Sequence, residues 1–136
     1  MSQIEKFIYP PNYQFSHSHL TQIKNLSEFD ISAILDHTLK ISTMSQEEST
    51  NYKPLLGKTQ INLFFENSTR TLASFELAGK KLGADTLNMA TDTSSIKKGE
   101  TLIDTAVTLN AMKPDILVVR HSMSGAIDLL SQKVNC

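Results

Sequence analysis

The stretch QINLFFENSTRTLASFELAGKKLGAD, residues 60–85, changes its pattern part-way and so decides the fold. Residues 60–66 are a short apolar run, which predicts a buried β-strand. From Leu72 onward apolar side chains recur at helical spacing, and Gly83 is suited to end that helix because glycine readily adopts the left-handed conformation. The chain therefore passes from strand to helix through the polar segment 66–71, with no glycine to ease the turn.

The same alternation continues to the end of the chain. Residues 115–121, DILVVRH, are the most β-branched run, and we expect this strand to be buried on both faces. Val134 opens a last short segment that resembles the start of a further strand. The predicted elements are strands over 60–66, 86–90 and 115–121 and helices over 72–82, 100–112 and 124–133. This order predicts an α/β fold, a three-layer arrangement with a parallel sheet flanked by helices.

A different organisation precedes residue 60. Residues 1–25 contain Pro10-Pro11 and scattered polar side chains, and we expect an irregular lead-in to one domain over 26–136. Ser27 and Asp30 have the spacing of a helix cap and open an amphipathic helix. Its apolar face comprises Ile31, Ile34, Leu35 and Leu39. Residues 43–58 are polar and interrupted by proline and glycine, which predicts a loop or a frayed helix end.

Composition excludes several classes of function. The formal net charge of −1 disfavours a general nucleic-acid or anionic-membrane binder. No apolar run approaches the roughly 20 residues that span a bilayer, and no secretory signal is evident at the N-terminus, so we expect a cytoplasmic protein. Cys136 is the single cysteine, and the four histidines do not group into a metal-binding pattern. We therefore expect no metal site.

Ligands of a parallel sheet bind where its strands end at their carboxyl side. After the first strand come Ser68, Thr69 and Thr71, which offer hydroxyl groups at a helix N-terminus, where unpaired N–H groups attract phosphate. Arg70 adds a planar fork suited to a phosphate or carboxylate. The alternative is that Ser68 or Thr69 simply caps the helix while Arg70 is solvated.

The next two strands also end in groups that bind anions. Residues 91–100 contain Ser94, Lys97 and Lys98, in a segment that could be a mobile charged loop, cross to a neighbouring subunit or close over a ligand. Arg120 ends the third strand, where either an anion or an ion pair with a local acid would satisfy it. The phosphate-binding motifs GxxxxGK[ST] and GxGxxG are both absent.

Residues 64–71, FFENSTRT, resemble the F-x-[EK]-x-S-[TG]-R-T signature of the aspartate and ornithine carbamoyltransferases. Segments 74–85, 93–105 and 116–121 resemble the same family in order and spacing, and the resemblance runs from about residue 14 to the end. The loop is similar to that of the aspartate-specific members, because Lys98 precedes a Gly-Glu pair.

The resemblance implies a role for each matching residue. Ser68, Thr69, Arg70 and Thr71 match the family's turn that binds the phosphate of carbamoyl phosphate. Arg70 is then placed to stabilise charge on the leaving phosphate, and Thr71 to donate to the carbamoyl oxygen. Arg120 matches the arginine that binds carbamoyl phosphate from the third strand.

The loop matches residues that act across a subunit interface. Ser94 and Lys98 match groups that reach into the active site of the adjacent subunit, and Lys98 also matches a contact with L-aspartate. Lys97 is assigned no role. The resemblance thus implies a homotrimer of catalytic chains, with regulatory chains possible. The charge and the lack of a long apolar run, given above, predict no nucleic acid or membrane as partner.

The implied reaction transfers the carbamoyl group from carbamoyl phosphate to L-aspartate. The products are N-carbamoyl-L-aspartate and phosphate, a step of de novo pyrimidine biosynthesis. Orientation of the reactants and preformed positive charge would supply catalysis without a cofactor.

The family continues into an HPTQ-type segment and an aspartate-binding domain, which this chain does not contain. We therefore expect a fragment of the first domain that is inactive alone. Two alternatives stay open, a non-catalytic module that assembles with a full-length catalytic chain and an ornithine-type carbamoyltransferase.

Overall fold

A computed structural model describes residues 10–90 and 101–136 of the chain. The chain divides into two compact units, Met1–Ser49 and Thr50–Cys136, which are called here the N-terminal unit and the sheet unit. Each is described by itself. None of the helices in the described residues is both long enough and apolar enough to cross a membrane.

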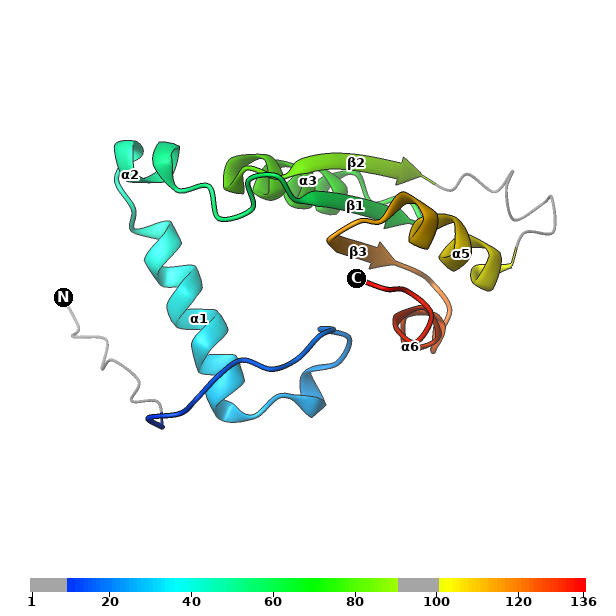
Figure 1. The fold of residues 1–136 in the computed structure, drawn as a ribbon, viewed down its shortest axis with the longest axis horizontal. Helices are drawn as coiled ribbons and strands as arrows, with labels where there is room; N and C mark the ends of the chain where they lie inside the picture. Colours follow the sequence, from blue (N-terminus) through cyan, green and yellow to red (C-terminus); the bar gives the residue numbers. More distant parts are fainter. Residues whose placement is uncertain (1–9, 91–100) are drawn as a thin grey trace. The chain divides into compact units, whose positions relative to one another are not determined.

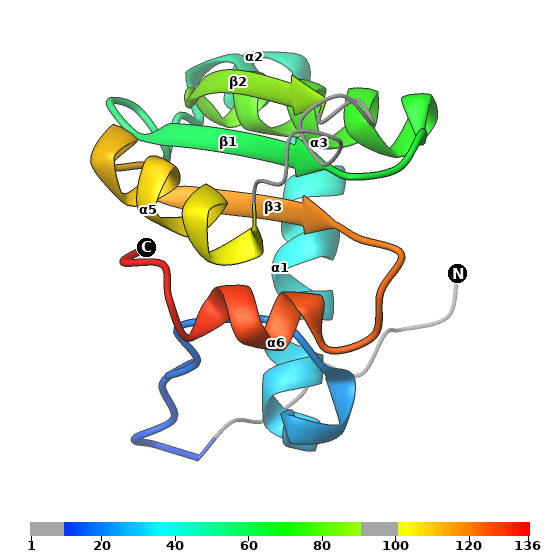
Figure 2. The ribbon, with the colours of Figure 1, turned by 90° about the vertical axis from the view of Figure 1, so that its right-hand side faces the viewer.

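The sheet unit contains three parallel strands in the order β2-β1-β3 (Figure 1). They are β1 (Thr59–Phe64), β2 (Asp85–Ala90) and β3 (Ile116–Arg120). Helix α3 (Thr69–Leu82) covers one face, and α5 (Leu102–Met112) and α6 (Ala126–Ser131) lie on the other (Figure 2). The predicted fold class, a parallel sheet between two helical layers, is confirmed.

The apolar core lies between the sheet and the pair α5 and α6. Its fully buried members are Ile61, Leu63, Ala106, Leu109 and Leu130. β1 carries two of them because it is the central strand, with a neighbour on each side. The expectation that the third strand is buried on both faces is wrong: residues 116–119 are only half-buried, since β3 has a described strand on one side only.

Local signals explain where the helices of the sheet unit begin and end. Gly83 has φ 95° and terminates α3 in the left-handed conformation, as predicted. Thr101 caps α5 in a reciprocal box with Asp104, so this helix begins at residue 102 rather than 100. α6 is shorter than the predicted helix over 124–133.

The last residues form no strand among the described residues, which corrects the prediction for Val134. Asn110 on α5 holds this segment instead. Its Nδ2 donates to the carbonyl of Lys133 at 2.7 Å, and its Oδ1 accepts from the backbone N–H of Asn135 at 2.9 Å. A side-chain amide therefore provides the hydrogen bonds that a neighbouring strand would provide.

The N-terminal unit is built on α1 (Glu28–Ser42), which begins with the predicted capping box of Ser27 and Asp30. A short 3₁₀ turn, η1 (Ile23–Asn25), precedes it. A further helix, α2 (Gln46–Asn51), occupies part of the segment predicted as a loop or frayed helix end. It spans the boundary between the two units.

Asp30 also ties the irregular lead-in to α1. Its buried carboxylate accepts hydrogen bonds from the Ser27 backbone and hydroxyl, from the Tyr13 hydroxyl at 2.8 Å and from His17 Nε2 at 3.1 Å. The bonds from Ser27, and then that from Tyr13, hold the pKa of Asp30 well below its usual range. Desolvation, with the bond to Asp30, raises the pKa of Tyr13 to about 12.

Candidate functional site

The carboxyl ends of β1 and β3 lie side by side, because Phe64 pairs with Arg120 in the parallel register. Immediately beyond this pair, the backbone N–H of Phe65 donates to the carbonyl of Arg120 at 2.9 Å. The rings of Phe65 and His121 follow with their centroids 4.5 Å apart. The two polar segments predicted after these strands therefore leave the sheet at the same end, which is the carboxyl end of β1 and β3.

The turn into α3 has two exposed and two half-buried polar residues. Ser68 occupies the N-cap position, but its side chain makes no capping hydrogen bond, and its Oγ donates to Thr71 Oγ1 at 2.9 Å instead. The alternative that Ser68 caps the helix is met in part, because Ser68 stands at the N-cap position but makes no side-chain capping bond. Thr69 and Arg70 are exposed. The first turn of α3 leaves backbone N–H groups for a ligand, and an anion suits the positive end of the helix dipole.

Arg120 forms an ion pair in this structure, as the second interpretation of this residue expected. Its Nε lies 2.5 Å from Glu66 Oε1, in the turn that follows β1. Both side chains are partly accessible, with 45% and 36% of their surface exposed. The Nη groups of a guanidinium carry four further donors, so an incoming phosphate oxygen would meet Arg120 already oriented by Glu66.

Sequence reasoning assigned no role to Glu66. The register explains why it belongs to the site: Glu66 follows the end of β1 by two residues, and β1 ends beside Arg120. A carboxylate in a turn adjacent to an arginine-bearing strand end is the signal that could have identified it.

The other predicted site residues fall in the segment 91–100. Ser94, Lys97 and Lys98 lie outside the described residues. The structure pairs Arg120 with Glu66, which precedes the turn over 68–71 by two residues, and the relation of these groups to the loop stays a prediction. Within residues 10–90 and 101–136, no group of three or more metal-ligating side chains occurs.

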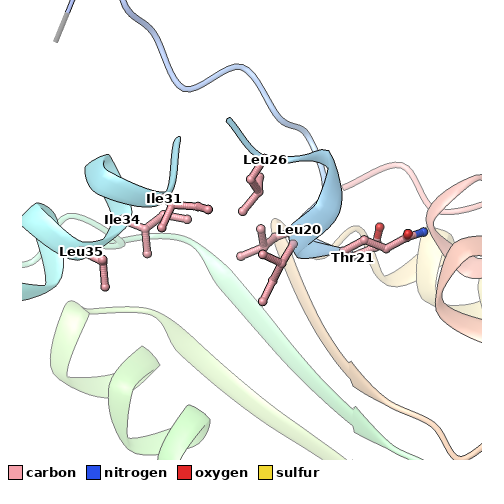
Figure 3. A pocket seen from close by; sticks show the side chains of 8 residues that line it. Leu20, Thr21, Leu26, Ile31, Ile34 and Leu35 are labelled. Carbon is pink, nitrogen blue, oxygen red and sulfur yellow. The ribbon is translucent and has the colours of Figure 1, made fainter. Parts of the chain in front are cut away.

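An apolar groove lies elsewhere, within the N-terminal unit. Leu20 and Leu26 point into it from the segment before α1, and Ile31, Ile34 and Leu35 point into it from the helix (Figure 3). Its lining lacks charged side chains, since the remaining members are Thr21, Gln22 and Ile23. The groove has none of the chemistry that binds an anion, so the strand-end site is the candidate functional site.

Comparison with known proteins shows the family of this chain. Residues 18–135 match the sequence profile of the aspartate/ornithine carbamoyltransferase, carbamoyl-P binding domain. The chain belongs to the aspartate/ornithine carbamoyltransferase family. Within this family the chain is similar to the aspartate carbamoyltransferase catalytic subunits of Ruegeria pomeroyi, at 63% identity over 122 residues, and Roseobacter denitrificans, at 60%. These alignments cover 90% of this chain and 39% of each relative.

Solved structures of the family share the fold. The catalytic subunit of the M. jannaschii aspartate transcarbamoylase superposes with a TM-score of 0.78 at 36% identity, covering 88% of this chain and 39% of that one. The Trypanosoma cruzi enzyme in complex with carbamoyl phosphate and aspartate superposes with a TM-score of 0.71 at 34% identity, covering 85% and 35%. The carbamoyltransferase resemblance of the signature turn is therefore confirmed at the level of the family and the fold.

Proposed function

We propose that this chain provides the carbamoyl-phosphate half of an aspartate carbamoyltransferase active site. The observation that carries the proposal is the position of the signature turn: it opens α3 at the sheet edge where Arg120 ends β3, in a chain 63% identical to an aspartate carbamoyltransferase catalytic subunit. The Trypanosoma cruzi relative was solved with carbamoyl phosphate and aspartate, which supports both as the substrates.

Each of the described site residues would make a different contact with carbamoyl phosphate. The N–H groups and hydroxyls of the turn over 68–71 would receive the phosphate, with the Arg70 guanidinium neutralising charge that grows on it as the bond to the carbamoyl carbon breaks. Thr71 would donate to the carbamoyl oxygen as that oxygen gains negative charge. Arg120 would hold carbamoyl phosphate from the end of β3.

Residues of the loop over 91–100 complete the proposal. Ser94 and Lys98 would reach the active site of an adjacent subunit, and Lys98 would also contact L-aspartate. The amine of L-aspartate then attacks the carbamoyl carbon, a tetrahedral oxyanion forms, and phosphate leaves. Preformed positive charge lowers the barrier because it is already oriented where negative charge develops.

The remaining parts of the proposal concern the whole protein. The chain spans 39% of the length of the relatives it matches, so the aspartate half-site, a homotrimer of catalytic chains and a role in pyrimidine biosynthesis rest on the family. Regulatory chains are compatible with such a homotrimer. The division into a lead-in over 1–25 and a carbamoyl-phosphate domain over 26–136, and the cytoplasmic location, stay predictions.

The test is an amide-resolved NMR titration of this chain with inorganic phosphate and with carbamoyl phosphate. We expect saturable shifts at the amides of 68–71, with weak millimolar affinity, and loss of these shifts in Arg70→Ala. Lys113→Ala, which removes a cation at the far end of α5, is the matched control and keeps them. Shifts that spread over all cationic surfaces, or that survive Arg70→Ala, would contradict the proposal.

A catalytic assay adds a second test. We expect the 136-residue chain to form no N-carbamoyl-L-aspartate, and a chain completed with the second domain of the Ruegeria pomeroyi relative to form it from aspartate rather than ornithine. Turnover by the unextended chain would overturn the expectation that it is inactive alone. A preference for ornithine in the completed chain would overturn the proposal that aspartate is the substrate.

A further inference from the structure

The sheet face beneath α3 is polar at its centre, where a covered sheet is normally apolar. Gln60 and Asn62 of β1 are 5% and 0% exposed, although they sit between the apolar residues of the central strand. Asn62 stands directly opposite Asn88 of β2 in the parallel register. Buried amides are costly unless they are hydrogen-bonded, so the partners of these two side chains show why the fold retains them.

The amides form one continuous chain of hydrogen bonds. Gln60 Nε2 donates to Asn62 Oδ1 at 2.9 Å, and Asn62 Nδ2 donates to Asn88 Oδ1 at 2.8 Å. Asn88 Nδ2 then donates to Glu76 Oε2 at 2.5 Å. Glu76 is a residue of α3, and Lys80, one turn further along the same helix, donates to its other oxygen. These hydrogen bonds therefore connect the buried strand β1, through β2, to the covering helix α3.

A second branch reaches the backbone of the same helix. Gln60 Nε2 also donates to the carbonyl of Phe75 at 2.9 Å. Gly79 makes this close approach possible, because an added Cβ would lie 2.5 Å from Gln60 Oε1 and 2.7 Å from Thr86 Cγ2. α3 is thus fastened at Phe75 and Glu76 by directional bonds, which define its position along the sheet more narrowly than apolar contacts do.

The position of α3 along the sheet matters for the site described above. Glu76 lies seven residues after the first residue of α3, which is about 10 Å along the axis of one continuous helix. A displacement at Glu76 therefore moves the turn over 68–71, while Arg120 stays with β3. The distance between these two anion-binding groups depends on where the amide chain holds the helix.

We propose that Asn62, acting through Asn88 and Glu76, is a positioning residue that places the turn over 68–71 beside Arg120 for anion binding. Asn62 itself touches no substrate in this proposal. The inference rests on the proposed function, because it assigns the amide chain a task in binding phosphate. A purely structural role is the competing explanation, and it predicts loss of stability without a change in the site.

Four variants separate the two explanations. Asn62→Leu removes the amide at nearly constant volume, and Glu76→Leu removes the acceptor on the helix. Glu76→Gln keeps an oxygen that accepts from Asn88 and is the conservative rescue. Ile61→Val is the matched control, since it perturbs the same strand on the opposite, apolar face. Each variant is measured for its urea midpoint, its phosphate dissociation constant and the ligand-free amide signals of residues 69–71.

We expect Asn62→Leu and Glu76→Leu to raise the phosphate dissociation constant about five- to tenfold and to shift the free amide signals of the turn. Glu76→Gln should stay within about twofold of the parent. Ile61→Val should lower the urea midpoint without either change. Unchanged affinity and unchanged turn signals in both leucine variants would overturn the inference.

The result stays interpretable if one part fails. The Glu76 side chain is 30% exposed, so the Glu76 pair decides the matter if Asn62→Leu does not fold. If the parent chain shows no response to phosphate, the proposed function fails for this chain. The free amide signals then still report on the turn, and their constancy in Glu76→Leu would overturn the positioning role by itself.

Discussion

The two faces of the sheet are built from opposite chemistry on the same central strand. Toward α5 and α6, β1 presents Ile61 and Leu63, which pack into a fully buried apolar cluster. Toward α3, the same strand presents Gln60 and Asn62, which are equally inaccessible but hydrogen-bonded. Because strand residues alternate between faces, four consecutive positions supply both environments.

The apolar face mainly contributes stability, and the polar face mainly fixes the position of the helix that covers it. Apolar burial is roughly proportional to area and has no preferred direction, so it stabilises the sheet unit without fixing one arrangement sharply. A buried amide adds little net stability, but it requires its partner at one distance and angle. The face that carries the helix with the signature turn is the one that uses directional contacts.

The largest effect is expected on the apolar face. Leu63→Ala should lower the free energy of unfolding by about 2–5 kcal/mol, because it removes buried methyl groups and leaves a cavity. Urea denaturation followed by circular dichroism measures it. Leu77→Ala is the matched control, since Leu77 lies on α3 with 54% of its surface exposed. Equal losses in the two variants would show that the apolar cluster does not dominate stability.

A smaller loss is expected where α3 approaches the polar face. Gly79→Ala should cost about 1–3 kcal/mol through overpacking, reduced by the roughly 0.5–1 kcal/mol that alanine gains over glycine in a helix. Urea denaturation measures the difference. The cost should shrink in a Gln60→Ala background, because Gln60 Oε1 is the nearest atom to the added methyl group. A net stabilisation by Gly79→Ala in the parent would mean that the helix can shift freely.

At the strand ends the effect concerns affinity. Glu66→Gln should tighten phosphate binding about threefold, because it removes a negative charge that competes for Arg120. An NMR titration at the turn measures the change. Asp115→Asn removes one negative charge near the other end of β3 and should leave the affinity unchanged. Weaker binding in Glu66→Gln would show that orientation of Arg120 by Glu66 outweighs the competition.

The smallest effect is the pH dependence of the polar face. Hydrogen bonds from Lys80, and then from Asn88, hold the pKa of Glu76 below its ordinary value. A carboxyl whose pKa is lowered by folding stabilises the protein above its unfolded value of about 4.3, and this contribution is lost as the pH falls below it.

Urea midpoints measured between pH 6 and pH 3 report this loss. The decline with falling pH should be shallower in Glu76→Gln than in the parent, because that variant has no carboxyl at this position. Ile61→Val should decline in parallel with the parent, since this substitution removes no titrating group. A Glu76→Gln profile identical to the parent profile would show that the Glu76 bonds do not persist in solution.

Much of the fold follows from local patterns in the sequence. Ser27 with Asp30 predicts the start of α1, and Gly83 predicts the end of α3, because each depends on neighbours along the chain. The pairing of β3 with a described strand on one side only could not be predicted this way, since strand order depends on pairing between distant segments.

The site was predictable in part for the same reason. The turn over 68–71 and Arg120 are recognisable as strand-end residues, and the register confirms that β1 and β3 end together. The ion pair of Arg120 with Glu66 and the burial of Asn62 depend on three-dimensional neighbours. Ser94 and Lys98 lie outside the described residues, and their roles stay predictions.

The pairing of Asn62 with Asn88 has a consequence for how the strands find each other. Apolar side chains tolerate a parallel strand displaced by two residues, because alternation places the same face toward the core. Such a displacement would separate Asn62 Nδ2 from Asn88 Oδ1 and leave this buried donor without its acceptor, at a cost of about 1–3 kcal/mol. The amide pair therefore penalises misaligned strands during folding and selects one alignment of β1 with β2.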